Sequence, residues 1–225
     1  MALEQAEGTG IALNVTRTRV TILVFNLTII SVMLSILNAA HSTSIEHLFT
    51  THLTSFAALF VSFCLTIFGL FWLLHSQTWD AQGLSRLRPF TFGSITTYLA
   101  LSHTITAFMH EYLLRFGSLE PGTTDSDLTI VPTVVFDNPV FLILLVMGGG
   151  VWLLTTYIAP LTTAVKGSAC GDQLWIFVGY YLALQVPVYW VYAKAWHLQY
   201  LSTEQSMNML NLFALQFIQP LLWFN

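Results

Sequence analysis

Residues 102-SHTITAFMHE-111 place two histidines and a glutamate in a segment that is otherwise apolar enough to lie in a membrane. Ionisable side chains are costly in lipid, so by default they indicate a functional site. His103 and His110 are seven residues apart and share a helix face, and Glu111 lies about 80° beyond His103. These residues can perform proton transfer. A buried carboxylic acid that keeps its proton can donate it to an alkene or epoxide, and a histidine can orient or reprotonate it.

A structural role is the alternative for these residues. His103 is then a neutral histidine hydrogen-bonded to threonine or tyrosine neighbours, and Glu111 extends to the outer membrane surface. A metal site is a further alternative, because five histidines lie toward the outer ends of their expected helices. These are His41, His47, His52, His110 and His197. No pair of them forms a compact motif such as H-E-x-x-H, so we predict neither a metal nor another cofactor.

The composition indicates which kind of protein positions these residues. The chain has 225 residues, of which 55% are hydrophobic and 8% are charged, and this is typical of an integral membrane protein. A helix that crosses a bilayer needs about 20 apolar residues. We therefore predict an all-α bundle of about six transmembrane helices. They cover residues 18–40, 50–75, 91–114, 139–163, 173–195 and 207–224.

The basic residues predict the orientation of this bundle. If the N-terminus is cytoplasmic, the cytoplasmic side holds Arg17, Arg19, Arg86, Arg88 and Lys166, and the opposite side holds Arg115 and Lys194. This distribution follows the positive-inside rule, so both termini are predicted to be cytoplasmic. The net charge of -4, without a basic cluster, argues against nucleic acid as a partner.

The last two expected helices carry polar and aromatic side chains that could line a cavity with the residues of segment 102–111. Pro187 removes a backbone hydrogen bond and is expected to kink the fifth helix. Polar residues at this density in lipid usually face the interior of a bundle. We predict that the ligand-binding residues are His110, Tyr181, Gln185, Tyr189, Trp190, Asn211 and Gln216.

The run 98-YLALSHTITAFMHEYLLRFGSLEP-121 resembles the histidine-bearing helix of the EXPERA family, which includes a sterol double-bond isomerase and the sigma-2 receptor. Two further segments, 135-VFDNPVF-141 and 165-VKGSACGDQLWIF-177, resemble later parts of that family. The resemblance implies a five-helix membrane domain over residues 46–225, with residues 1–45 forming a tail and an extra transmembrane helix. It also implies that Asp137 is a second acidic site residue and that the endoplasmic reticulum is the location.

Two functions follow from these residues. We predict a membrane-embedded isomerase or cyclase that protonates a sterol or terpenoid and rearranges the carbocation, with His103, Glu111 and Asp137 as catalytic residues. The substrate enters from lipid. The alternative is a non-catalytic protein that binds sterols or amphipathic amines, as the sigma-2 receptor does. This alternative is favoured by Ala107 and Leu144, which stand where the isomerase has glutamates. A homodimer is left open.

Overall fold

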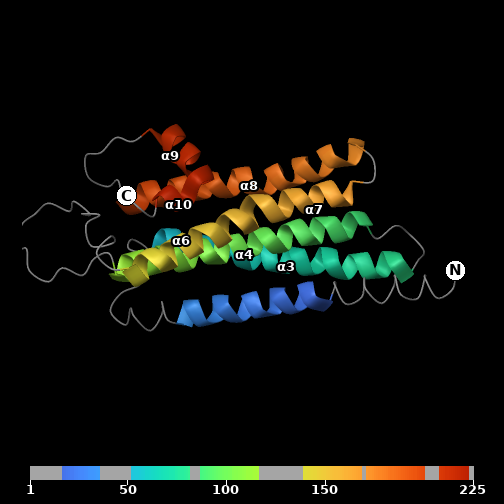
Figure 1. Cartoon of the computed structure of the whole chain (residues 1–225), viewed down its shortest axis with the longest axis horizontal. Coiled ribbons are helices and arrows are strands. Elements are labelled where there is room, and N and C mark those ends of the chain that lie inside the picture. The colour runs from blue at the N-terminus through green and yellow to red at the C-terminus, as the bar shows by residue number, and fades with distance from the viewer. Residues whose placement is uncertain are drawn as a thin grey trace, which may run out of the picture.

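The computed structural model describes residues 17–35, 52–81, 87–116, 139–168, 171–200 and 208–222. The secondary structure in these ranges is entirely helical, and the long helices lie side by side in a bundle (Figure 1). Four helices are long and apolar enough to cross a membrane. The class of all-α integral membrane protein is therefore confirmed. The four helices are Arg17–Ser35, Leu53–Thr78, Leu142–Gly167 and Gln173–Gln199.

Helix α4 (Leu87–Phe116) is the centre of this arrangement, although it is not one of the four apolar helices. It contacts α3 (Leu53–Ala81), α6 (Pro139–Leu153), α7 (Ala159–Gly167) and α8 (Gly171–Tyr200). At 30 residues it is longer than the ~20 residues that a membrane crossing needs. The apolar helices that surround α4 allow a more polar helix to be buried at this depth.

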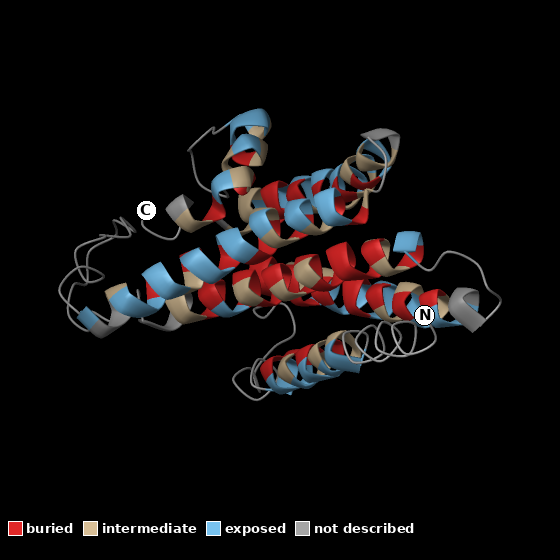
Figure 2. Cartoon of the chain, turned by 45° about the vertical axis from the view of Figure 1, so that its right-hand side comes forward, coloured by how far each residue is buried: buried red, intermediate tan, exposed pale blue. Residues whose placement is uncertain are grey.

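Burial follows the pattern expected for a protein surrounded by lipid. Figure 2 shows buried residues concentrated in the middle of the bundle, and exposed residues on the outward faces of the outer helices. The exposed side chains include large apolar ones such as Val146 and Met147 on α6 and Trp175 on α8. Lipid tails are as apolar as these side chains, so exposure of this kind costs little in a membrane.

Asn26 joins helix Arg17–Ser35 to the rest of the bundle. The side chain is fully buried, and its Nδ2 donates to Ser62 Oγ at 3.1 Å and to Thr66 Oγ1 at 2.9 Å, both on α3. Its Oδ1 accepts from Thr104 Oγ1 on α4 at 2.7 Å. Polar side chains hold membrane helices together in this way. The first helix, which lies outside the resemblance to the EXPERA family, is thus bound to the helix that carries the candidate site.

Asn26→Leu is expected to lower the free energy of unfolding by about 2 kcal/mol, because three interhelical hydrogen bonds at roughly 0.6 kcal/mol each are lost. Thermal unfolding in detergent measures the effect. Asn211→Leu is the matched control, because the side chain of Asn211 is exposed on α9 (Met209–Leu215). Equal melting temperatures for the two variants would contradict the role given to Asn26.

A π-helical turn, η1 (Leu154–Ile158), connects α6 to α7. In a straight α-helix a proline ring clashes with the carbonyl group four residues earlier, and the wider turn ends just before Pro160. The turn contains buried Thr156, whose Oγ1 lies 2.7 Å from Ser102 Oγ on α4. The π-helical turn is thus hydrogen-bonded to the residue that precedes His103.

The predicted sixth span, residues 207–224, is not one continuous helix. It consists of α9 with 7 residues, the 3-10 turn η2 (Gln216–Ile218) and α10 (Gln219–Leu222) with 4 residues. In Figure 1, α9 approaches α8 and α10 leads back toward the end of the bundle where α8 ends. Apolar stretches of roughly 10–14 residues are typical of re-entrant or interfacial segments. The count of six crossings and two cytoplasmic termini are therefore not confirmed.

Candidate functional site

A series of polar side chains on α4 is buried against the surrounding helices. In a membrane such groups must find partners within the protein, because lipid offers none. The ionisable residues among them mark the places along α4 where a proton transfer could occur. They are Thr91, Ser94, Thr96, Thr97, Ser102, His103, Thr104, Thr106, His110 and Glu111.

Glu111, near the end of α4, is paired with His52, which immediately precedes α3. His52 Nδ1 lies 2.7 Å from Glu111 Oε1, which is a hydrogen-bond distance for an imidazole N–H that donates to a carboxylate. Both residues are buried, with 8% of His52 and 6% of Glu111 exposed. A base and an acid that can exchange a proton are therefore held together away from bulk water.

The first turn of α3 lies beside this pair. The backbone N–H of Phe56 donates to the carbonyl oxygen of His52 at 2.9 Å, so His52 occupies the position that precedes the first helical residue. The N–H and the hydroxyl of Thr54 both donate to Gln199 Oε1, at 2.9 and 2.7 Å, and this holds the end of α8 against α3. A helix N-terminus carries partial positive charge and is a favourable place for a carboxylate such as that of Glu111.

His103, deeper in the bundle, is held by α8 on both sides of its ring. Nε2 lies 3.0 Å from Gln185 Oε1, and Nδ1 lies 2.8 Å from the hydroxyl of Tyr192. Gln185 Nε2 in turn donates to the hydroxyl of Tyr189 at 3.2 Å. A neutral histidine that donates through Nε2 and accepts at Nδ1 satisfies all of these contacts. The structural interpretation of His103, as a histidine bonded to a tyrosine neighbour, accounts for this geometry.

His103 and Glu111, predicted to act together, each have a hydrogen bond to a different residue instead. They are eight residues apart on α4, which separates them by about 12 Å along the helix axis. The alternative in which Glu111 extends to the outer surface is wrong, because the side chain is buried against His52. His110 is also buried, and its ring contacts that of Trp196 edge to face at 5.4 Å between centroids.

Gln216, another predicted ligand-binding residue, is buried within a chain of hydrogen bonds. Its Oε1 accepts from Gln219 Nε2 at 3.1 Å, and Gln219 Oε1 accepts from the hydroxyl of Thr106 at 2.8 Å. Trp152 Nε1 donates to the same hydroxyl at 3.1 Å. The segment formed by α9, η2 and α10 is thereby bound to α4 one turn beyond His103.

The remaining predicted residues divide between the inside and the outside of the bundle. Tyr181 and Tyr189 are buried, as a role in an interior site requires. The interior placement of Trp190 and Asn211 is wrong: Trp190 is 45% exposed and Asn211 is exposed. Trp190 faces outward because Tyr189, one residue earlier, takes the inward position on α8. Asp137 lies outside the described residues.

His52 was grouped in the sequence with four other histidines as a possible metal ligand and was not paired with Glu111. A signal for the pair is the short connection between α3 and α4, because it places the start of α3 beside the end of α4. His41 and His47 lie outside the described residues. Within the described ranges, no group of three or more His, Cys, Asp or Glu side chains is placed to hold a metal ion.

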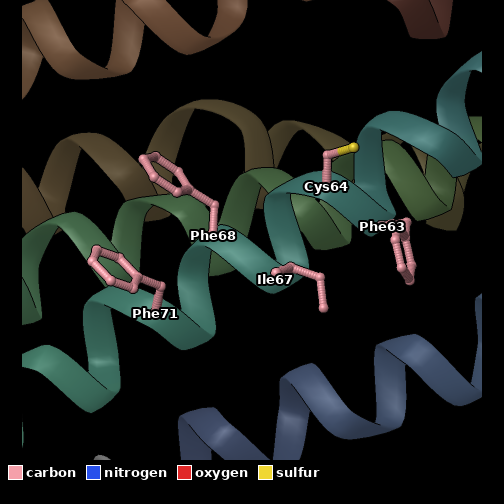
Figure 3. Close-up of a pocket in the computed structure, with 5 residues that line it drawn as sticks. All are labelled: Phe63, Cys64, Ile67, Phe68 and Phe71. Atoms are coloured by element: carbon pink, nitrogen blue, oxygen red, sulfur yellow. The ribbon is translucent and has the colours of Figure 1, made fainter.

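The outer face of α3 carries an apolar hollow of about 550 Å³ (Figure 3). One of its side chains, Phe68, points toward α8, where the ring of Tyr180 lies 6.4 Å away. The hollow opens on the exposed surface of an apolar helix, so a lipid chain is a chemically suitable occupant. It is lined by Phe63, Cys64, Ile67, Phe68 and Phe71.

No family model matches this chain, and no curated protein and no solved structure matches it either. The resemblance to the EXPERA family therefore depends on the quoted segments alone and stays a prediction. The protein is defined by its architecture: an all-α membrane protein in which apolar helices surround a polar one, with a buried His52–Glu111 pair at one end.

Proposed function

We propose that this protein is a membrane-embedded isomerase or cyclase that acts on a sterol or terpenoid by acid–base catalysis. The observation that supports the proposal is the buried His52–Glu111 pair, with its 2.7 Å separation. Replacing a buried ionic pair by apolar residues of similar volume often leaves the stability unchanged or raises it. A need for stability therefore does not explain why such a pair is present. Ionisable residues at such positions are by default functional.

In the proposed reaction the pair transfers a proton to one carbon of an alkene. The π electrons form the new C–H bond, and the adjacent carbon becomes a carbocation. A neighbouring carbon then loses a proton to the basic member of the pair, and its C–H electrons form a double bond at a new position. In a cyclisation, a second alkene attacks the cation before the proton is lost. The proton balance is zero, so the reaction needs no oxidant, reductant or cofactor.

In a cyclisation the positive charge moves along the substrate to the second alkene, and the aromatic residues deeper in the bundle fit a cation at that position. The rings of His103 and Tyr192 are edge to face at 5.4 Å, and those of Tyr189 and Phe217 at 4.7 Å. Aromatic faces attract positive charge. A substrate with its alkene at Glu111 would extend along α4 toward these rings. His103 is then a positioning residue for Tyr192 and not the proton donor.

The proposed location is a membrane, and the proposed partner is a hydrophobic ligand. The four apolar helices support an integral membrane protein whose ligand reaches it through lipid. Location in the endoplasmic reticulum and assembly into a homodimer both stay predictions.

Lipid binding without turnover is the second candidate function. The observation that favours it is the apolar hollow on α3, which could hold a sterol without any contact with the His52–Glu111 pair. Pockets of about 300–1,000 Å³ are typical of small-molecule sites.

The test is isomerisation in deuterated water. The protein is reconstituted with a lipid extract from a host that makes sterols and terpenoids, and the products are analysed by mass spectrometry. We expect a new isomer that carries one deuterium, because the donated proton comes from groups that exchange with water. Glu111→Gln and His52→Gln should each lower the rate by roughly 100-fold or more, which is typical for the loss of an acid–base group.

His75→Gln is the matched control, because His75 is a histidine near the opposite end of α3, where its ring stacks on Phe71. It should keep the wild-type rate. Wild-type rates in both Glu111→Gln and His52→Gln would remove the pair from the mechanism. An unchanged extract, with a sterol that co-purifies with the protein, would establish the binding function instead.

A further inference from the structure

Ser55, in the first turn of α3, is fully buried, and its hydroxyl has no hydrogen-bond partner among the described residues. The other buried serines of α3 each donate to a carbonyl oxygen: Ser62 to Ala100 at 2.7 Å and Ser76 to Leu73 at 2.7 Å. A buried polar group without a partner costs about 1–3 kcal/mol. Such groups are rare, and a bound molecule is one of the explanations for them.

The position of Ser55 connects this hydroxyl to the candidate site. Ser55 follows His52 by three residues, so it lies within about one helical turn of the residue that is paired with Glu111. The N–H and hydroxyl of Thr54 are both bonded to Gln199, so they are already occupied. The apolar span of α3 begins at Leu53, which places this turn at one boundary of the span.

We propose that Ser55 binds the hydroxyl group of a lipid alcohol whose alkene lies beside the His52–Glu111 pair. A serine hydroxyl can donate and accept at once, as an alcohol requires of its partner. A lone serine hydroxyl lacks the charge that strong recognition of an anionic head group such as a phosphate uses. An amphipathic lipid keeps its polar group at the membrane boundary and its apolar body in the hydrocarbon core. The position of the alkene rests on the proposed function, whereas recognition of the hydroxyl does not.

This inference makes the proposed substrate class more specific. It favours sterols and terpenoid alcohols over terpenoid hydrocarbons and diphosphates. It also places the polar end of the substrate at the first turn of α3, with the apolar body directed toward His103.

The experiment measures binding of farnesol and cholesterol, each compared with its methyl ether, to the detergent-solubilised protein by native mass spectrometry. The ether keeps the oxygen but cannot donate a hydrogen bond. We expect the wild type to prefer at least one alcohol over its ether by about fivefold, as one hydrogen bond implies. Ser55→Ala should bind the alcohol and its ether equally. Ser76→Ala, whose serine is already satisfied, should keep the preference.

The melting temperature of Ser55→Ala shows whether a loss of binding preference reflects misfolding. Removing a hydroxyl that has no partner is expected to leave the melting temperature of Ser55→Ala at or above that of the wild type. A preference that persists in Ser55→Ala overturns the proposal, and so does failure of the wild type to bind any of the four lipids.

Turnover in deuterated water, measured on the same samples, separates this inference from the proposed function. A hydroxyl preference that depends on Ser55, without any isomer product, overturns the isomerase or cyclase and supports the Ser55 site. An isomer product, together with a hydroxyl preference that is unchanged in Ser55→Ala, supports the isomerase or cyclase and overturns the Ser55 site.

Discussion

Glu111→Ala is expected to lower the free energy of unfolding by about 3–5 kcal/mol, because it removes one partner of a buried ionisable pair. His52 Nδ1 would then lose its contact with the carboxylate, and His52, 8% exposed, would lie next to a cavity. A buried group stripped of its partner loses the hydrogen bond and keeps the cost of burial. Chemical denaturation in detergent measures the loss.

Glu111→Gln is the graded control for this prediction. The amide keeps the volume and one acceptor oxygen for His52 Nδ1, so the loss should be about 1–2 kcal/mol. In the double variant His52→Ala/Glu111→Ala, the combined loss should be smaller than the sum of the two single losses, because the residues share one contact. Additive losses would show that the two side chains do not interact.

Gly167→Ala is expected to cost about 1–3 kcal/mol through overpacking where α7 meets α4. A Cβ atom at Gly167 would lie 2.8 Å from Thr91 Cγ2 and closer still to Thr91 Oγ1. Thr91 cannot easily turn aside, because it is β-branched and its hydroxyl donates to the carbonyl oxygen of Leu87 at 2.8 Å. Thermal unfolding in detergent should show a clear decrease in melting temperature.

Gly179→Ala is the matched control, since a Cβ atom there has no neighbour within 4 Å. In a helix this change should stabilise the protein by up to about 1 kcal/mol, because alanine is the better helix former. Adding Thr91→Ala to Gly167→Ala should recover most of the lost stability. If Gly167→Ala and Gly179→Ala behave alike, α7 and α4 do not approach each other as closely as the structure shows.

The membrane class and most helix positions could be predicted from the sequence because they depend on local composition. The predicted span 91–114 lies inside α4, Leu87–Phe116, and the predicted span 173–195 lies inside α8, Gly171–Tyr200. An apolar run that satisfies its own backbone hydrogen bonds has few alternatives to a helix in lipid. The end of the chain differs because its run is short and contains Pro220, which favours a broken segment.

The site was only half predicted, because it depends on which helix faces meet. A soluble helix shows its buried face as an apolar stripe, but a lipid-facing helix is apolar on both faces, so periodicity could not show that Trp190 points outward. The partner of Glu111 was missed for a similar reason. His52 lies 59 residues earlier, and its contact is created by the packing of α3 on α4.

The π-helical turn at Leu154–Ile158 sets the rotational register between the two halves of this membrane span. Its hydrogen bonds run from residue i to i+5, so it takes up more residues per turn than an α-helix and rotates the helix that follows relative to the helix before it. Trp152 before the turn and Ala164 after it are both buried, so both halves present a face to the interior of the bundle. Deleting one residue between Trp152 and Pro160 would therefore be expected to rotate one half away from its neighbours and to break the Thr156–Ser102 hydrogen bond.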